Sequence, residues 1–437
     1  MLEAFQNHIH NKLAFLRERK LLIAISGGVD SVVLAHLCAR SGFNFLLAHC
    51  NFNLRGDESD ADEDFISDLA DDLDKEVFIQ HFDTKAYAEE HKCSIQMAAR
   101  ELRYDWFTEL AEQLHFDYIL TAHHADDNLE TFLINFSRGT GLEGLTGIPE
   151  VNGLFVRPLL PFSNDSIRSF AENNKIAWRE DSSNVSVKYL RNKLRHEVIP
   201  ILKEINPSLL ESFQNTLDNL NDTADIVEES VQAVLNRAII SIDSYKVVYN
   251  IAKFSKLNNP KAYLFEIFKS YGFKAWDDVL NLLDAQPGKF VHSDSHRLIK
   301  DRECLILTDA QPSDFKCVKI NNFNKKIKTP FGKLSFSEVK NTGSETENLI
   351  FIDGDVLQMP LVLRSRKEGD VFYPKGMTGK KTLSKYFKDE KFSLVDKEQA
   401  LLLCSGKDIV WILGKRADDR FKVTDKTKHI LKIELTP

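Results

Sequence analysis

The stretch that decides the fold is residues 21–31, LLIAISGGVDS, where an apolar run passes into two glycines and then into polar residues. A short apolar run that ends at a glycine turn is typical of a buried parallel strand. The residues that follow, VDSVVLAHLCAR, read as a helix, and Gly42 is a suitable residue to end it. The stretch therefore predicts a strand, a tight turn and a helix.

The same alternation continues through the first half of the chain. Residues 43–52, 76–82 and 116–124 read as further strands, with helices expected at 94–114 and 127–139. Strands that alternate with helices predict a doubly wound parallel α/β sheet.

The pattern changes after about residue 205. Residues 207–238 have helical periodicity and contain no glycine, residues 260–285 read as two short helices, and residues 289–308 read as a hairpin. From about residue 315 the chain is rich in short strands. We expect an α/β catalytic domain at 1–208, a mostly helical middle domain at 209–312 that contacts RNA, and a small mixed α/β, RNA-binding domain at 313–437.

Charge is segregated along the chain. The net charge of -8 argues by itself against a nucleic-acid partner. Acidic residues are concentrated at 57–76, where we expect a solvated helix face that points away from any polyanion. Basic residues gather at 188–203, 364–391 and 415–432, so the surface that meets RNA can be positive while the sum is negative.

The cysteines and the N-terminus indicate a cytoplasmic protein. Six cysteines are scattered without a CxxC pair, which disfavours a zinc ribbon, a redox centre or a disulfide scaffold. The first 20 residues read as an amphipathic helix and not as a signal peptide. No run approaches the roughly 18 apolar residues of a membrane span. We therefore expect reduced thiols, no membrane partner and a cytoplasmic location.

The loop SGGVDS, residues 26–31, has the features of a phosphate site. Two adjacent glycines allow a sharp turn that points backbone N–H groups inward, and the next helix adds its positive N-terminal end. Asp30 would repel phosphate, but a bound Mg²⁺ would bridge the two. The alternative is a glycine turn in which Ser or Asp caps the helix.

A second motif, TAHHADDNLET at residues 121–131, lies where a strand passes into a helix. Ligands bind at this edge of parallel sheets, so Asp126 and Asp127 could hold Mg²⁺ or an ammonium group. A dinuclear metallohydrolase site and simple charge stabilisation of the helix end are the alternatives.

Two arginine pairs lie at helical spacing. Arg100 and Arg103 are three residues apart within QMAARELRY, and Arg191 and Arg195 are four apart within YLRNKLRH. Each pair shares a helix face suited to phosphate, and a solvated surface face is the alternative for both. The segment 138–147, RGTGLEGLTG, adds four glycines, which are typical of a loop that approaches a ligand closely.

Together these motifs resemble those of the PP-loop ATP pyrophosphatases, which have an adenine nucleotide alpha hydrolase-like fold. Among these, the segments HCNFNLR (49–55), QMAARELRY (96–104), AHHADDNLET (122–131), RGTGLEGLTG (138–147), RPLL (157–160) and the run from WREDSSN to RNKLR (178–195) are similar to the lysidine synthetase family. Asn53 stands where that family often has histidine.

The resemblance implies an ATP-dependent ligase that adenylates the wobble cytidine of the CAU-anticodon tRNA(Ile) and then attaches free L-lysine. It implies catalytic roles for Asp30, Asp126, Asp127 and Arg100. It implies ATP contacts from Ser26, Gly27, Gly28, Val29, Asp30, Ser31, His49, Arg100 and Gly141. It implies Mg²⁺ at Asp30 and Asp127. It implies tRNA contacts from Arg191, Arg195, Arg364, Arg366, Lys380, Lys381 and Lys385.

Basic residues of the last domain alternate with Phe372, Tyr373, Tyr386 and Phe387, which fits base stacking on RNA or, alternatively, a hydrophobic core. Two other functions stay open. A tRNA thiolase would share the ATP loop, although such enzymes commonly carry CxxC pairs, and a non-catalytic RNA-binding protein would explain only the basic C-terminal part. Apolar faces of the middle domain would serve internal packing or a homodimer.

Overall fold

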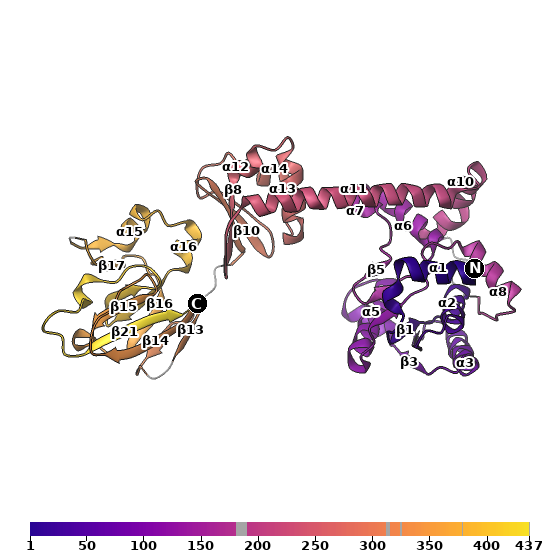
Figure 1. The fold of residues 1–437 in the computed structure, drawn as a ribbon, viewed down its shortest axis with the longest axis horizontal. Coiled ribbons are helices and arrows are strands. Elements are labelled where there is room, and N and C mark those ends of the chain that lie inside the picture. The colour runs from indigo at the N-terminus through magenta and orange to yellow at the C-terminus, as the bar shows by residue number, and fades with distance from the viewer. Residues whose placement is uncertain (181–189, 312–314, 324–325, 378, 437) are drawn as a thin grey trace. The chain divides into compact units, whose positions relative to one another are not determined.

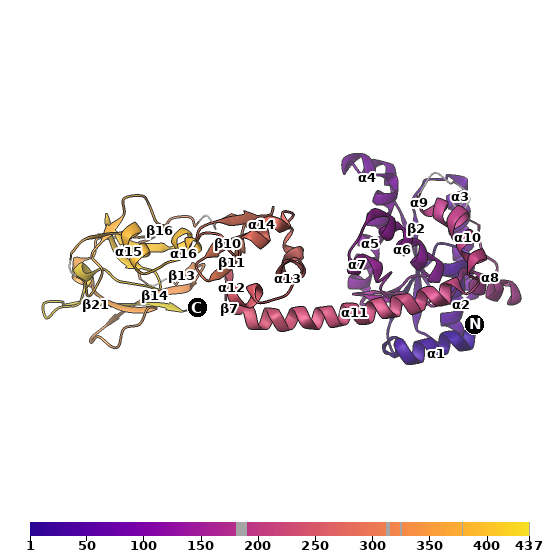
Figure 2. The ribbon, with the colours of Figure 1, turned by 90° about the horizontal axis from the view of Figure 1, so that it is seen from above.

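The computed structural model describes residues 1–180, 190–311, 315–323, 326–377 and 379–436. These residues form two compact units, Met1–Val227 and Glu228–Pro437. The 30-residue helix α11 (Leu209–Ala238) runs through the boundary between them as one helix (Figures 1 and 2). The three domain limits expected from the sequence stay a prediction. Over the described ranges, no helix is both long enough and apolar enough to span a membrane.

The first unit is built on a six-stranded sheet in the order β3-β2-β1-β4-β6-β5. Strands β3, β2, β1, β4 and β6 pair in parallel, and β5 adds an antiparallel edge. The strands are β1 (Leu21–Ala24), β2 (Phe45–Asn51), β3 (Val77–His81), β4 (Tyr118–Leu120), β5 (Val151–Asn152) and β6 (Phe155–Val156). The predicted parallel α/β sheet is confirmed.

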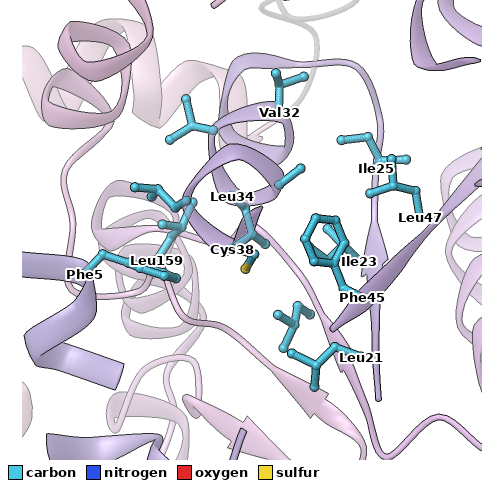
Figure 3. Close-up of a cluster of buried hydrophobic side chains, with 14 of the residues drawn as sticks. Phe5, Leu21, Ile23, Ile25, Val32, Leu34, Cys38, Phe45, Leu47 and Leu159 are labelled. Carbon is cyan, nitrogen blue, oxygen red and sulfur yellow. The ribbon is translucent and has the colours of Figure 1, made fainter. Parts of the chain in front are cut away.

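Helices cover both faces of this sheet because alternate strand residues point to opposite sides. Leu21 and Ile23 of β1 belong to the core that α1 (Leu2–Lys12), α2 (Val29–Arg40) and α8 (Asn164–Asn173) cover. Figure 3 shows Leu34 and Cys38 of α2 beside these strand side chains. Leu22 points the other way, into the core shared with α5 (Ile95–Leu114). Each large apolar side chain buried here stabilises the fold by about 1.5–3 kcal/mol.

The carboxyl ends of β1, β2 and β4 meet at one edge of the sheet, as parallel strands require. The segments that leave this edge are the SGGVDS loop, the turn after β2 and the residues before α6 (Ala125–Arg138). The motifs singled out in the sequence therefore lie on neighbouring loops.

The second unit begins with the end of α11 and a five-stranded antiparallel sheet in the order β7-β8-β11-β10-β9. Its strands are β7 (Ile239–Asp243), β8 (Lys246–Asn250), β9 (Phe290–His292), β10 (His296–Asp301) and β11 (Cys304–Asp309). Helices α13 (Pro260–Phe268) and α14 (Trp276–Asn281) pack on it, so the two predicted short helices are confirmed. Strands β7 and β8 have no counterpart among the expected elements.

The rest of this unit holds two four-stranded antiparallel sheets, in the orders β12-β16-β19-β20 and β13-β14-β21-β15, which share one core. Their strands are β12 (Val318–Ile320), β13 (Ile327–Thr329), β14 (Gly332–Val339), β15 (Leu349–Asp353), β16 (Leu361–Ser365), β19 (Leu401–Ser405), β20 (Asp408–Ile412) and β21 (Ile430–Thr436). Beside them lie the small pair β17 (Val371–Phe372) and β18 (Lys381–Thr382) and the helices α15 (Leu383–Asp389) and α16 (Leu394–Gln399).

Three aromatic residues of the last domain are part of its core. Phe372, Tyr386 and Phe387 are 0%, 3% and 1% exposed and pack together beside α15. They cannot stack on an RNA base in this conformation, and of the two readings of this aromatic pattern the core reading is the correct one for them. Tyr373 is half-buried, with the Arg420 guanidinium 4.5 Å above its ring.

Candidate active site

The SGGVDS loop is held in its turn by its own side chains. Gly27 has φ +83°, a conformation that favours glycine. The Ser31 hydroxyl donates to the Gly28 carbonyl at 3.0 Å and accepts from the Ser26 backbone N–H at 3.2 Å. Val29 begins α2, so the loop ends at a helix N-terminus. Such an arrangement is pre-organised to bind an anion.

A cavity of about 690 Å³ opens beside this loop. Its wall includes Asp30 from the first turn of α2, His49 from β2 and Asp127 from the first turn of α6. Five arginines also reach it, namely Arg55, Arg103, Arg179, Arg191 and Arg195. Part of the wall is apolar or aromatic, formed by Phe52, Ile95, Ala99, Tyr104, Phe107 and Phe155. The cavity thus combines a cationic phosphate surface with surface suited to a nucleobase.

Two carboxylates of the cavity surround a buried histidine. His124 is 3% exposed, and its Nε2 lies 3.7 Å from Asp30 Oδ2 and 3.4 Å from Asp127 Oδ2. Asn164 donates to Asp30 Oδ1 at 3.3 Å. Burial raises the pKa of Asp30 above its ordinary range. Asp30 and Asp127 therefore form a compact acidic site at the end of the phosphate loop.

Asp126 and Asp127, adjacent in the sequence, have different surroundings. Asp126 is not part of the cavity wall and accepts from Lys203 Nζ at 2.7 Å and from the Asn164 backbone N–H at 2.8 Å. Burial alone would raise the pKa of Asp126, but these hydrogen bonds outweigh burial and lower it. Asp127 instead accepts from Arg195 at 3.2 Å and from the His124 backbone N–H at 3.1 Å. Asp126 is thus paired with Lys203 outside the cavity wall, whereas Asp127 lies at the cavity, and the catalytic role expected for Asp126 stays a prediction.

Replacing Asp126 by Asn should destabilise the first unit by about 2 kcal/mol at pH 7, because Lys203 loses its buried partner. Folding lowers the pKa of Asp126, so its ionised carboxylate adds to the free energy of unfolding. That contribution is complete above the unfolded-state pKa of about 3.9 and is lost as the pH falls through the lower folded-state pKa. Urea unfolding of both proteins at pH 7 and at about pH 3 measures this. If the difference in unfolding free energy between wild type and Asp126→Asn grew on acidification, the stabilising role of the Asp126–Lys203 pair would be contradicted.

Glu130, a residue of the TAHHADDNLET motif, holds two of the cavity arginines. Its side chain is 0% exposed and accepts from Arg195 Nε at 2.6 Å, while Arg191 Nε lies 3.2 Å from its other oxygen. Burial would lower the pKa of Arg195, but the hydrogen bonds to Glu130 outweigh burial and raise it. Glu130 thus fixes both guanidinium groups at the cavity wall.

Two other histidines of the cavity are neutral at pH 7. Burial lowers the pKa of His49, and its Nδ1 lies 3.0 Å from the Ile25 carbonyl oxygen, which requires that nitrogen to carry the proton. Burial also lowers the pKa of His123 to about 4. The unprotonated nitrogen of His49 is therefore Nε2, and His123 Nδ1 lies 3.0 Å from the Thr121 hydroxyl oxygen.

The structure places the predicted site residues as follows. Ser26, Gly28, Asp30, Ser31, His49 and Asp127 line the cavity, and Gly27 and Val29 complete the loop. Arg103 lines the cavity, whereas Arg100 is exposed and stacks on Tyr104, and neither Arg100 nor Gly141 contributes to the wall. Arg191 and Arg195, expected to contact tRNA, face the same cavity as the phosphate loop.

Residues 181–189, including Asp181 to Asn184 of the WREDSSN motif, lie outside the described residues.

The basic residues predicted in the second unit differ in their availability. Arg364 donates to both oxygens of Asp370 at 2.7 and 2.9 Å, and Lys381 pairs with Asp389 at 2.7 Å. The other three, Arg366, Lys380 and Lys385, are exposed.

Sequence reasoning gave the helix face of Arg100 and Arg103 a role with phosphate. It quoted Arg55 and Arg179 within motifs without assigning them a site, and it missed Asp62. Asp62 is 8% exposed and lines the cavity, although it belongs to the acidic run expected to be solvated. The helical spacing carried the signal that Asp62 is buried. Asp62 is four residues before Ile66, which is fully buried, so the two side chains share one face of the helix.

The two cavity carboxylates have the chemistry of a magnesium site that a nucleotide would complete. Among the residues described, no three His, Cys, Asp or Glu side chains form a metal-binding group. Mg²⁺ in nucleotide sites commonly takes one or two carboxylates, with phosphates and water completing its shell. Asp30 and Asp127, both near one histidine nitrogen, supply two such carboxylates.

Three family models match the chain. A PP-loop domain matches residues 1–202, a TilS substrate binding domain matches residues 242–311, and a TilS substrate C-terminal domain matches residues 361–435.

Curated relatives match along the whole chain. A tRNA(Ile)-lysidine synthase from Parabacteroides distasonis is 38% identical and covers 99% of each chain. One from Bacteroides thetaiotaomicron is 38% identical over 97% of each. Among solved structures, a U34-tRNA thiolase from Methanococcus maripaludis superposes with a TM-score of 0.42 at 18% identity, over 50% of this chain and 78% of that chain.

Proposed function

The chain belongs to the tRNA(Ile)-lysidine synthase family, and on this premise we propose that it joins free L-lysine to C2 of cytidine 34 in the CAU-anticodon tRNA(Ile). It is an ATP-dependent enzyme that modifies tRNA. Its substrates would place it in the cytoplasm. A homodimer stays a prediction.

The reaction takes two steps. The cytosine O2 attacks the α-phosphorus of ATP, the bond from that phosphorus to the bridging oxygen breaks, and pyrophosphate leaves. The ε-nitrogen of lysine then attacks C2, the C2–O2 bond breaks, and AMP leaves with that oxygen. Adenylation is needed because the cytosine oxygen is otherwise a poor leaving group.

The observation that carries this proposal is the single cavity in which the SGGVDS loop, the acidic pair and the arginines converge. Backbone N–H groups and guanidinium groups fixed beside a reacting phosphate stabilise its developing charge without reorganising. The aromatic part of the wall would receive a nucleobase. The lysine ammonium must lose a proton before attack, and the cavity carboxylates are the nearby acceptors.

Asp30 and Asp127 would hold Mg²⁺, which when bound neutralises phosphate charge. Around it, Ser26 and Ser31 keep the loop in shape, and Arg191 and Arg195 stay in place through Glu130.

In the second unit, changing Arg366, Lys380 and Lys385 together to Ala should weaken tRNA affinity about 10-fold or more at physiological salt, because exposed cations bind RNA through phosphate contacts. The salt dependence of binding should become shallower. Filter binding across a salt series measures both, and pyrophosphate release at saturating tRNA should stay near wild type. An unchanged affinity and salt slope would remove these residues from the tRNA interface.

The experiment that tests the function is pyrophosphate release by the full chain with ATP, Mg²⁺ and CAU-anticodon tRNA(Ile), with lysine withheld. We expect about one equivalent of pyrophosphate per active enzyme–tRNA complex and a tRNA that carries AMP. Adding lysine should then release AMP. Methionine tRNA, which has the same anticodon, is the matched control. Pyrophosphate release without any adenylated nucleoside would contradict the proposal.

A tRNA thiolase is the second candidate. Its first step would look the same, so the second nucleophile decides between them. If the adenylated tRNA reacted with a sulfur donor and not with lysine, the thiolase assignment would replace ours.

A further inference from the structure

The acidic helix α3 (Asp57–Asp72) sends one carboxylate into the cavity wall. Most of its acidic residues are solvated, as expected from the sequence, and Asp64 is one of them. Asp62 differs, because it is 8% exposed and lies on the helix face that Ile66 and Leu69 bury. A buried carboxylate in this position requires partners.

Its partners are two arginines from two other segments. Asp62 Oδ2 accepts from Arg55 Nη2 at 2.8 Å, and Asp62 Oδ1 accepts from Arg179 Nε. Arg55 follows β2, and Arg179 follows α8. All three side chains line the cavity, and the two arginine side chains are 32% and 37% exposed.

The same cluster is joined to the phosphate loop. The Arg179 backbone N–H donates to the Gly27 carbonyl at 2.9 Å. Gly27 is the residue of the loop with positive φ. A shift of Arg179 would therefore be transmitted to the turn that shapes the phosphate site.

The cavity thus has two walls built in the same way. On one, Glu130 holds Arg191 and Arg195; on the other, Asp62 holds Arg55 and Arg179. Asp127 adds a second carboxylate beside Arg195, and Glu58 Oε2 lies 4.0 Å from Arg55 Nη1, while all four guanidinium groups still reach the cavity wall. A buried ion pair is by itself weak support for stability, since apolar replacements are often equally stable. Two such clusters facing one cavity are better explained by a need to hold guanidinium groups at the cavity wall.

We propose that Asp62 is a positioning residue that holds the guanidinium groups of Arg55 and Arg179 beside the phosphate loop to receive the pyrophosphate leaving group. As the α-phosphorus–oxygen bond breaks, negative charge builds on the departing pyrophosphate, and two fixed guanidinium groups stabilise it. The inference rests on the proposed adenylation step, and it assigns the lysine step no dependence on Asp62.

The test separates the two chemical steps in Asp62→Asn, with Asp64→Asn as the matched control on the same helix. Pyrophosphate release is measured in a single turnover with saturating ATP and tRNA. After the adenylated tRNA has accumulated, lysine is added and AMP release is timed. We expect pyrophosphate release about 100-fold slower in Asp62→Asn, in line with the loss of one fixed charge donor. We expect lysine-dependent AMP release within about 3-fold of wild type, because pyrophosphate has already left.

Further variants keep the test informative if Asp62→Asn folds poorly. Arg55→Lys and Arg179→Lys retain the charge but lose the planar fork, so each should slow pyrophosphate release and weaken inhibition by added pyrophosphate. Asp62→Glu should recover part of the rate. Combining Asp62→Asn with Arg179→Lys should cost less than the product of the single losses.

Three results would overturn the inference: Asp62→Asn releasing pyrophosphate at the rate of Asp64→Asn, both steps slowing equally, or the Arg→Lys variants leaving pyrophosphate inhibition unchanged. Failure of the wild-type protein to release pyrophosphate with tRNA would instead overturn the proposed function, so the two failures are distinguishable.

Discussion

Asp30→Asn should lower pyrophosphate release by at least about 1000-fold and leave tRNA affinity within about 2-fold of wild type. Asp30 lies at the end of the phosphate loop. Its Oδ2 is 3.7 Å from His124 Nε2, and Asp127 Oδ2 is 3.4 Å from the same nitrogen. The amide keeps the size and the hydrogen bond from Asn164 but removes the charge. Single-turnover pyrophosphate release and filter binding measure the two quantities, with Asp64→Asn as control. An Asp30→Asn protein with more than a tenth of wild-type activity would contradict the assignment.

The same substitution should stabilise the protein when no nucleotide is bound. Burial raises the pKa of Asp30, so its negative charge costs folding free energy at neutral pH. That cost disappears as pH falls through the raised pKa. Asp30→Asn should therefore melt at a higher temperature than wild type at pH 7, and the gap should narrow as the pH is lowered. A lower melting temperature at pH 7 would contradict this.

Glu130→Ala should have the second largest effect, because it removes the one carboxylate that holds both Arg191 and Arg195. The two guanidinium groups would then repel each other more strongly, with Asp127 left beside Arg195. We expect a stability loss of about 3–5 kcal/mol, the usual cost of breaking a buried ion pair. We also expect a rate loss of about 100-fold or more, since two of the five cavity arginines lose their position.

Urea unfolding and single-turnover assays at a temperature where the variant is folded would separate these effects. Glu172→Ala, an exposed glutamate on α8, is the matched control. Glu130→Gln should lie between Ala and wild type in stability, because it keeps the volume and one acceptor. If Glu130→Ala were as stable and active as wild type, Glu130 would not be the residue that holds Arg191 and Arg195 at the cavity.

The parallel sheet and its loops were predictable because the signals are local. An apolar run followed by glycines determines a strand and a turn, and parallel order then brings SGGVDS and TAHHADDNLET to one edge. The long glycine-free helix, α11, was equally clear from its periodicity.

Other features depend on tertiary packing, which cannot be read from a single sequence. Arg100 and Arg103 are three residues apart, and only the rotation of α5 decides that Arg103 reaches the cavity. The pairing of Arg191 and Arg195 with Glu130 spans more than 60 residues. Asp62 looked like its solvated neighbours because neither Arg55 nor Arg179 is on its helix.

The measurement that tests the central claim most directly is incorporation of radiolabelled L-lysine into tRNA by the full chain, with ATP and Mg²⁺. The CAU-anticodon tRNA(Ile) and methionine tRNA are compared in parallel. We predict ATP-dependent label on tRNA(Ile), lost when cytidine 34 is replaced by uridine, and almost none on methionine tRNA. Absence of label on tRNA(Ile), while AMP and pyrophosphate are still released, would contradict the account.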